Sequence, residues 1–201
     1  MSKIGQARLA ILVGHRGRGS NMANLIRQSR AGKLHAAVGV VVSTGRDSPA
    51  LAIADAEHVA TRIVPTTAPD YERMLLDALK EHRVDLVCLA GYMRLLPQNI
   101  LDAYPHRVLN IHPALLPKFG GQGMYGAHVH RAVLDSGDAE SGCTVHLVNE
   151  RYDEGPIIHQ LRCPVLPDDT PETLAARVLE LEHEAYVVAI NHVIDHFSLA
   201  H

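Results

Sequence analysis

Residues 9–21 read Leu9-Ala10-Ile11-Leu12-Val13-Gly14-His15-Arg16-Gly17-Arg18-Gly19-Ser20-Asn21, an apolar run followed directly by a glycine-rich turn. The apolar run is typical of a buried strand. Helical spacing of apolar residues then begins at Asn21 and continues to Arg30. A buried strand, a tight turn and a helix in that order indicate a sheet whose parallel strands alternate with helices.

The same alternation continues through the first half of the chain. Further strands are predicted at 37–42, 61–64, 85–90 and 107–111, and further helices at 49–58, 70–82 (capped by Asp70) and 97–104. The strand at 85–90 is apolar on both faces, as in a parallel sheet covered by helices on each side. The pattern predicts an α/β fold with a doubly wound, mostly parallel sheet.

The pattern changes in the second half. A helix at 128–134 precedes two strands, 141–148 and 156–165, whose short connection predicts an antiparallel hairpin and therefore a mixed sheet. The last helix opens with Thr170-Pro171-Glu172, a cap residue, a proline and an early acid, and is expected to run to about His196. No repeat or linker divides the chain, so residues 1–201 are predicted to form a single domain flanked by helices.

The composition is that of an ordinary globular protein with nearly balanced charge. The chain has 201 residues, 19 Lys and Arg against 22 Asp and Glu, and a net charge of −3. A nucleic-acid-binding protein usually carries a basic excess, and no apolar run resembles a signal peptide or a membrane span, so neither partner is expected. The three cysteines are odd in number, which predicts reduced thiols and a cytoplasmic location.

Ligands of such sheets bind in the loops beyond the carboxyl ends of the strands. The loop 14–21 joins glycines to a helix start and carries Arg16 and Arg18, which favours an anion such as phosphate, although a plain turn with solvated arginines remains an alternative. The loop 91–97 follows the most buried strand and suits a flat heteroaromatic ligand, but simple packing explains its leucines equally well.

A third loop carries the strongest catalytic signal. Residues two apart in a strand point to the same face, so Asn110 and His112 are expected to project together at the end of their strand. A carboxamide beside an imidazole is suited to stabilising a developing oxyanion. Asp153, in the turn between the two later strands, is either a turn residue or an acid that reaches His112 and raises its pKa.

Taken in order, these motifs resemble the folate-dependent glycinamide ribonucleotide (phosphoribosylglycinamide) formyltransferases, over about residues 10–192. The matching segments are residues 17–21, 89–96, 110–117, 142–146 and 153–158. The resemblance implies a Rossmann-like formyltransferase fold, with phosphate and substrate binding in the N-terminal half and folate binding in the C-terminal half. It also implies transfer of the formyl group of 10-formyltetrahydrofolate, as cosubstrate, to the amine of glycinamide ribonucleotide in purine (IMP) biosynthesis.

The resemblance implies a role for each matching residue. Asn110 would donate a hydrogen bond to the tetrahedral oxyanion, and His112, as an imidazolium, would stabilise it and supply a proton. Asp153 would raise the pKa of His112 and keep it charged near neutral pH. The residues implied in binding are Gly19, Ser20 and Asn21 for the phosphate, Glu182 for the glycinamide, and Met93, Arg94, Leu95, Leu96 and Asn110 for the folate.

The chain also departs from the family's pattern. Arg16 and Arg18 stand where members usually carry small or neutral residues, and no arginine lies near Ala68, where some members direct one at the folate. The segment 118–126 is longer than in short-loop members. Its glycines indicate a mobile flap, Gly120–Gly126. We expect Lys118, at the start of the segment, to lie near the substrate phosphate.

Other functions remain open as alternatives. A formyltetrahydrofolate hydrolase (deformylase) and methionyl-tRNA formyltransferase share much of the motif set but are typically longer chains. A non-catalytic folate- or nucleotide-binding protein would need no proton donor. No metal is expected, because His128 and His130 are two apart on a helix and face different ways. Either a monomer or a homodimer is compatible with these features.

Overall fold

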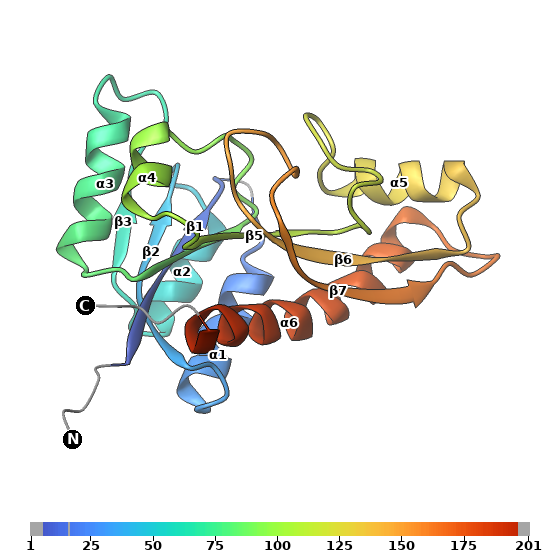
Figure 1. Ribbon diagram of the computed structural model, residues 1–201, viewed down its shortest axis with the longest axis horizontal. Helices are drawn as coiled ribbons and strands as arrows, with labels where there is room; N and C mark the ends of the chain where they lie inside the picture. Colours follow the sequence, from blue (N-terminus) through green and yellow to red (C-terminus); the bar gives the residue numbers. More distant parts are fainter. Residues whose placement is uncertain (1–5, 16, 197–201) are drawn as a thin grey trace. The chain divides into compact units, whose positions relative to one another are not determined.

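The computed structural model describes residues 6–15 and 17–196, in which strands and helices alternate as an α/β protein (Figure 1). The strands are β1 (Ala7–Val13), β2 (Ala36–Ser43), β3 (Thr61–Ile63), β4 (Leu86–Ala90), β5 (Val108–His112), β6 (Glu140–Leu147) and β7 (Ile157–Pro164). The helices are α1 (Ser20–Arg30), α2 (Pro49–Ala56), α3 (Tyr71–Glu81), α4 (Gln98–Ala103), α5 (Ala127–Ser136) and α6 (Pro171–His196).

The strands of the described residues form one mixed sheet in the order β3-β2-β1-β4-β5-β6-β7. β1 pairs in parallel with both β2 and β4, and β2 pairs in parallel with β3. β6 pairs antiparallel with β5 on one side and β7 on the other. The predicted mostly parallel sheet with a later antiparallel hairpin is therefore confirmed.

The chain divides into two compact units. The first unit comprises Met1–Val108 together with Ile190–His201, and the second unit comprises Leu109–Ala189. The parallel strands β1 to β4 belong to the first unit, and the antiparallel β6–β7 hairpin belongs to the second.

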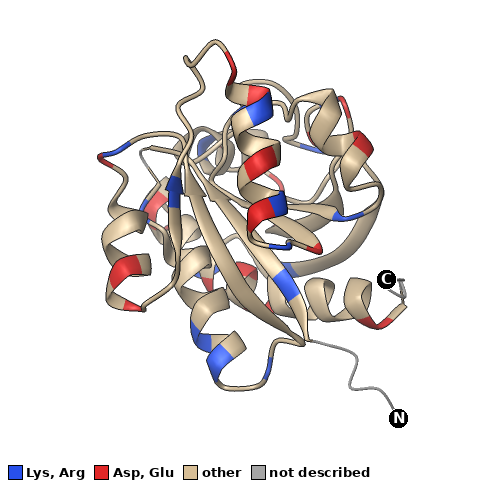
Figure 2. Cartoon of the chain, turned by 90° about the vertical axis from the view of Figure 1, so that its left-hand side faces the viewer, with Lys and Arg blue, Asp and Glu red and all other residues tan. Residues whose placement is uncertain are grey.

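The first unit is built around two central strands. Leu9, Ile11 and Leu12 of β1 and every residue of β4 are buried. Strands covered on both faces need apolar side chains on both, which explains the continuous apolar runs. Charged residues in the view of Figure 2 lie mainly on the helices, whereas the strands carry few.

The second unit contains the helix start that the sequence indicated. The Oγ1 of Thr170 accepts a hydrogen bond from the amide of Thr173 at 3.3 Å, and the amide of Thr170 donates to Oγ1 of Thr173 at 2.9 Å. This reciprocal cap satisfies donors that the first turn of α6 leaves unpaired. Further along α6, Tyr186 is fully buried and its hydroxyl donates to the carbonyl of Leu109 at 3.1 Å.

The predicted caps and boundaries were not all right. Asp70 precedes α3 as expected, but its carboxylate pairs with Arg73 and does not cap the helix. An ion pair within one turn competes with the cap because both use the same carboxylate. α5 extends beyond the predicted 128–134 and ends at Ser136. The next residue, Gly137, caps it with a φ of 71°, the left-handed conformation typical of a helix C-terminus.

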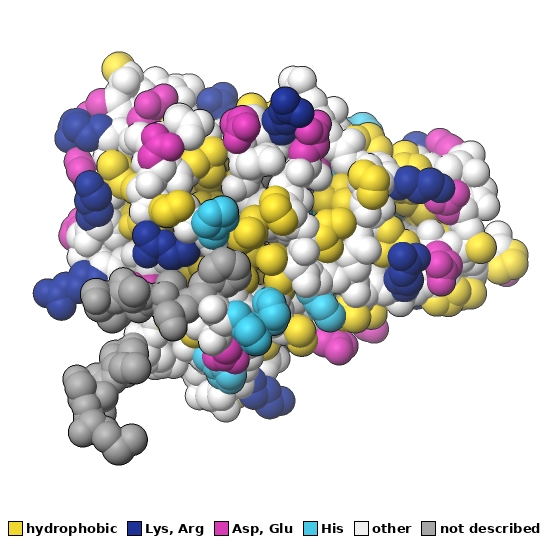
Figure 3. All heavy atoms as spheres, in the orientation of Figure 1, with side chains coloured by type: hydrophobic (Ala, Val, Ile, Leu, Met, Phe, Trp, Pro, Cys, Tyr) yellow, Lys and Arg dark blue, Asp and Glu magenta, His cyan; other side chains and the backbone are white. Residues whose placement is uncertain are grey.

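Two further features bear on possible partners. Within the described residues no helix is both long and apolar enough to cross a membrane. On the face of the molecule seen in Figure 3, Lys and Arg side chains lie scattered among Asp and Glu and do not gather into one basic patch. The even distribution agrees with the balanced charge of the chain.

Candidate active site

The second unit brings together Asn110, His112 and Asp153, as the sequence predicted. Asn110 and His112 lie on β5, where they face His146 and Thr144 of β6 across the antiparallel ladder. His112 and His146 are buried, and Asp153 lies in the turn between β6 and β7. Asp153 has a φ of 57°, a left-handed backbone conformation that aspartate tolerates better than most residues.

The two ring nitrogens of His112 have different partners. Nε2 lies 2.8 Å from the carbonyl oxygen of Phe119, and Nδ1 lies 3.5 Å from Oδ2 of Asp153. Because a carbonyl oxygen can only accept, Nε2 must carry a hydrogen. The atom that gains and loses a proton is therefore Nδ1, which faces Asp153.

Asn110 is oriented by His146, a residue for which no individual role was predicted. Nδ1 of His146 donates to the carbonyl of Leu147 at 2.9 Å, so in the neutral ring Nε2 is the acceptor. Nδ2 of Asn110 lies 3.1 Å from this Nε2 and 3.4 Å from Oδ1 of Asp153. An amide nitrogen has two hydrogens, so Asn110 can donate one to His146 and the other, in the longer contact, to Asp153.

Asp153 is held from several sides. Its Oδ2 accepts a hydrogen bond from the amide of Gly121 at 3.0 Å, and its Oδ1 lies 3.4 Å from Nε2 of His146. Burial raises the pKa of Asp153, but the adjacent His146 ring, the charge of His112 and the Gly121 amide outweigh it and hold the pKa below its ordinary value. Asp153 is therefore a carboxylate at neutral pH.

The protonation of His112 is set by opposing effects. Burial lowers its pKa most, while the Asp153 carboxylate and the Phe119 carbonyl raise it and His146 lowers it. The expected contribution of Asp153 is present, but the net pKa lies below the ordinary value. The prediction that His112 is kept charged near neutral pH is therefore wrong for the free protein.

The glycine-rich segment begins in contact with this cluster. Phe119 and Gly121 supply the backbone groups that bind His112 and Asp153. Lys118 pairs with both carboxylate oxygens of Asp138, at 3.0 and 2.7 Å. Glu182 of α6 is buried in the same unit. The start of the segment is thus hydrogen-bonded to His112 and Asp153, and Lys118 has a carboxylate partner.

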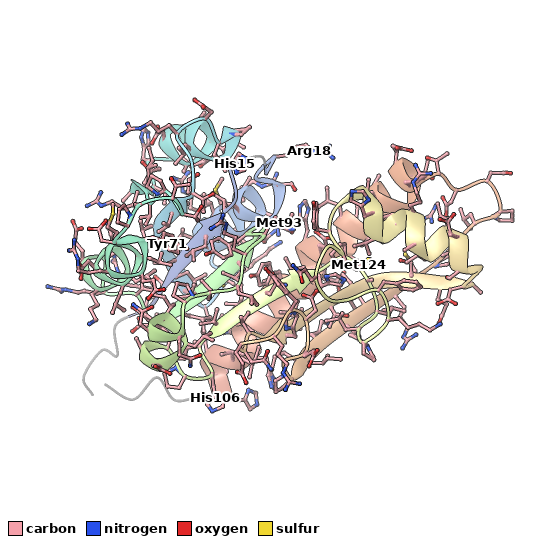
Figure 4. The ribbon with its side chains drawn as sticks, turned by 90° about the horizontal axis from the view of Figure 1, so that it is seen from above. His15, Arg18, Tyr71, Met93, His106 and Met124 are labelled. Carbon is pink, nitrogen blue, oxygen red and sulfur yellow. The ribbon has the colours of Figure 1, made fainter. Side chains whose placement is uncertain are left out.

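The first unit contains the two other loops predicted to bind ligands. The loop after β1 carries His15 and Arg18, and the loop after β4 carries Met93, at the same end of the parallel strands (Figure 4). The amide of Gly14 donates to the carbonyl of Gly91 at 3.1 Å. A Cβ on Gly14 would lie 2.5 Å from that oxygen, so only glycine permits this approach.

The start of α1 has the form expected of an anion site. Gly19 precedes the helix with a φ of 78°, no side chain caps the helix, and its first turn has no acidic residue. Backbone amides at such a helix start attract an anion. Ser20 and Asn21 form the first turn of α1, Arg18 is exposed, and Arg16 lies outside the described residues.

The loop after β4 presents apolar side chains to solvent. Met93 is 53% and Leu95 43% exposed, Arg94 is exposed as well, and Leu96 is buried. A cavity of about 700 Å³ lies between this loop and the start of α3, lined by residues that include Ala68, Tyr71, Arg94 and Leu95. The size falls within the range of small-molecule sites.

Comparison with known proteins decides the family. Residues 7–190 match the formyl transferase family. The chain belongs to the formyl transferase family. A phosphoribosylglycinamide formyltransferase of Escherichia coli is 36% identical over 89% of this chain and 84% of its own length. The Arabidopsis thaliana chloroplastic enzyme of that name is 39% identical over 94% of this chain.

Solved structures agree with the sequence relatives. The crystal structure of a phosphoribosylglycinamide formyltransferase from Brucella melitensis has a TM-score of 0.84 at 43% identity, covering 94% of this formyl transferase and 95% of that chain. A formyltetrahydrofolate deformylase from Pseudomonas syringae has a TM-score of 0.83 at 24% identity, which shows a shared fold alone. This chain spans 65% and 59% of the lengths of the Arabidopsis and Vigna unguiculata relatives.

Among the described residues of this formyl transferase, no group of three or more side chains is arranged to hold a metal ion. His130 is buried and His128 is exposed, so the two histidines face different surroundings. His146 is the functional candidate that sequence reasoning missed. Its only signal was its place in the motif at residues 142–146, because its position opposite Asn110 depends on the register of β5 and β6.

Proposed function

We propose that this formyl transferase moves the formyl group of 10-formyltetrahydrofolate to the amine of glycinamide ribonucleotide, giving formylglycinamide ribonucleotide and tetrahydrofolate in purine biosynthesis. The observation that carries the proposal is the convergence of the buried His112 with the partly buried Asn110 and Asp153. The names of the relatives support the choice of substrates. The odd number of cysteines, Cys88, Cys143 and Cys163, supports a reducing compartment such as the cytoplasm.

The chemistry begins with attack of the amine nitrogen on the formyl carbon, which forms a carbon–nitrogen bond and a tetrahedral oxyanion. His146 engages one N–H of Asn110, and the other turns from its long 3.4 Å contact with Asp153 to donate to that oxygen. A donor fixed in advance stabilises charge where it develops, at little cost of reorganisation. Asn110 thus acts on the oxyanion, and His146 holds Asn110 in place.

His112 carries the proton between the two nitrogens. Because burial lowers its pKa, the ring is mostly neutral before reaction, and Nδ1 takes the proton that the attacking amine loses. Asp153, facing Nδ1 at 3.5 Å, stabilises the imidazolium that forms. The same proton passes to the departing N10 of the folate as its bond to the formyl carbon breaks, so no external proton is consumed.

The remaining residues are proposed to bind the substrates, as the family resemblance implies. Gly19, Ser20 and Asn21 bind the phosphate, supported by the uncapped start of α1. The segment Met93–Leu96 holds the pterin through its backbone, supported by the exposed apolar side chains beside it. Glu182 contacts the glycinamide, and no metal takes part.

The test is an assay of purified protein with 10-formyltetrahydrofolate, with and without glycinamide ribonucleotide. We expect release of tetrahydrofolate only when the amine substrate is present. Formate production in water alone would favour the deformylase reaction. Binding of both ligands without turnover would favour a non-catalytic role.

A further inference from the structure

The segment after β4 begins with a buried side chain, Tyr92, and ends with another, Leu96. Tyr92 is 7% exposed, whereas its neighbour Met93 and the nearby Leu95 are largely exposed. The backbone from Gly91, with a φ of 76°, turns away from the strand at this point. The position of the exposed segment therefore depends on how Tyr92 is held.

Tyr92 has a hydroxyl partner in Tyr71, the first residue of α3. The two hydroxyls are hydrogen-bonded to each other. Tyr71 is labelled in Figure 4 at the start of its helix. Burial raises the pKa of Tyr71 despite the lowering effects of Tyr92 and Arg94, so the Tyr71 ring keeps its hydroxyl hydrogen at neutral pH.

Other contacts fix the ends of the same segment. On one side, Gly91 accepts the backbone hydrogen bond from Gly14 at 3.1 Å. On the other, Nδ2 of Asn99 in α4 donates to the carbonyl of Glu72 in α3 at 3.2 Å. Between these ends, the Tyr71–Tyr92 bond is a polar tie from the segment to α3.

The tie also borders a cavity. Tyr71 and Arg94 both line the space of about 700 Å³ between α3 and the segment. A flat ligand held by backbone groups needs those groups fixed before it binds, because ordering a loop on binding reduces affinity. The Tyr71–Tyr92 bond therefore lies where disorder of the segment would weaken the binding of such a ligand.

We propose that Tyr71 is a positioning residue for the formyl-folate, acting through its hydroxyl bond to Tyr92 to hold Met93–Leu96 in the binding conformation. The inference rests on the proposed function, in which this segment holds the pterin. Tyr71 acts through Tyr92 and takes no part in the proton transfers. Its loss should therefore weaken folate binding and leave kcat and the KM for the amine substrate unchanged.

The experiment uses Tyr71→Phe, Tyr92→Phe and the double variant, each of which keeps the rings and removes only oxygen atoms. Affinity for tetrahydrofolate is measured by calorimetry, and kcat and both KM values by assay. Tyr104→Phe is the matched control, since Tyr104 is 6% exposed in the same unit and its ring packs against Arg107. Thermal melting of each variant checks that the fold is kept.

We expect each single variant to raise the Kd for tetrahydrofolate and the KM for the formyl-folate about three- to tenfold, the range of one hydrogen bond. The double variant should lose no more affinity for tetrahydrofolate than the single variant with the larger loss, because both substitutions remove the same Tyr71–Tyr92 hydrogen bond. Tyr104→Phe should bind like the wild type.

Two outcomes would overturn the inference and leave the proposed function standing. One is wild-type binding in all three variants, and the other is independent, multiplying losses in the double variant. Failure of the wild-type protein to bind tetrahydrofolate would overturn the proposed function and this inference together.

Discussion

Nε2 of His112 lies 2.8 Å from the carbonyl oxygen of Phe119, which leaves Nδ1 as the nitrogen that exchanges protons. The consequence is that Asp153, at 3.5 Å from Nδ1, interacts with the atom that changes charge. The backbone of the glycine-rich segment therefore takes part in setting the tautomer of the His112 imidazole.

Asp153→Asn should lower the pKa of His112, because the carboxylate raises that pKa against the effect of burial. His112 must be neutral to accept the first proton, so activity is lost as pH falls through its pKa, and the variant should move this acid limb to lower pH. Turnover should fall about 100-fold or more, because the imidazolium loses its counter-charge.

NMR titration of His112 and the pH dependence of kcat/KM measure both effects. Glu154→Gln is the control, because Glu154 lies in the same turn but pairs with the exposed Arg151. An unchanged titration of His112 in Asp153→Asn would remove Asp153 from its assigned role.

His146→Ala should reduce kcat about tenfold, because Asn110 loses the acceptor that orients its amide and the oxyanion then meets a less ordered donor. The KM values should change little, since His146 contacts Asn110 and Asp153 and is not among the residues proposed to bind substrate. Steady-state kinetics distinguish the two parameters. A rise in KM with kcat intact would show that His146 serves binding instead.

Gly121→Ala should raise the pKa of Asp153 and slow turnover. Gly121 has a φ of 99°, which a Cβ strains, and its amide donates to Oδ2 of Asp153. Gly123→Ala is the matched control for Gly121→Ala. Gly123 has a φ of 88°, and like Gly121 it has nothing within 4 Å of an added Cβ. Equal loss of activity in both variants would indicate general loop strain and contradict a specific role for the Gly121 amide.

Stability should decrease as pH falls from 7 to 5. Burial lowers the folded-state pKa of His112 and of His130, with further effects from neighbouring charges, so the unfolded chain binds protons first as pH drops through about 6.5. Asp153 adds a loss only at lower pH, as pH falls towards its lowered folded-state pKa.

The free energy of unfolding in urea at pH 7 and pH 5 measures this loss. His130→Gln removes one of the groups and should make the pH dependence shallower. The same pH dependence in wild type and variant would show that His130 does not contribute.

Features set by local sequence were predictable. The Thr170 cap depends on residues within one turn, and the shared projection of Asn110 and His112 follows from the two-residue period of a strand. Asp153 could be linked to His112 only through the family resemblance, because a turn acid and its partner 41 positions away are not connected by any local pattern.

Features set by register and competing partners were not predictable. His146 meets Asn110 only because β5 and β6 pair in one register. Asp70 has the residue type of a cap but binds Arg73, and Lys118 binds Asp138. The net pKa of His112 depends on burial, which the residue types alone do not reveal.

The most direct test of the central claim is a single turnover with 10-formyltetrahydrofolate labelled with carbon-13 in the formyl group, followed by NMR. With glycinamide ribonucleotide present, we predict that the wild-type protein places the label in the formamide product, and that His112→Gln, which lacks the proton carrier, transfers it at least about 100-fold more slowly. Label appearing in formate at the same rate with and without the amine, or equal transfer by His112→Gln, would contradict the account.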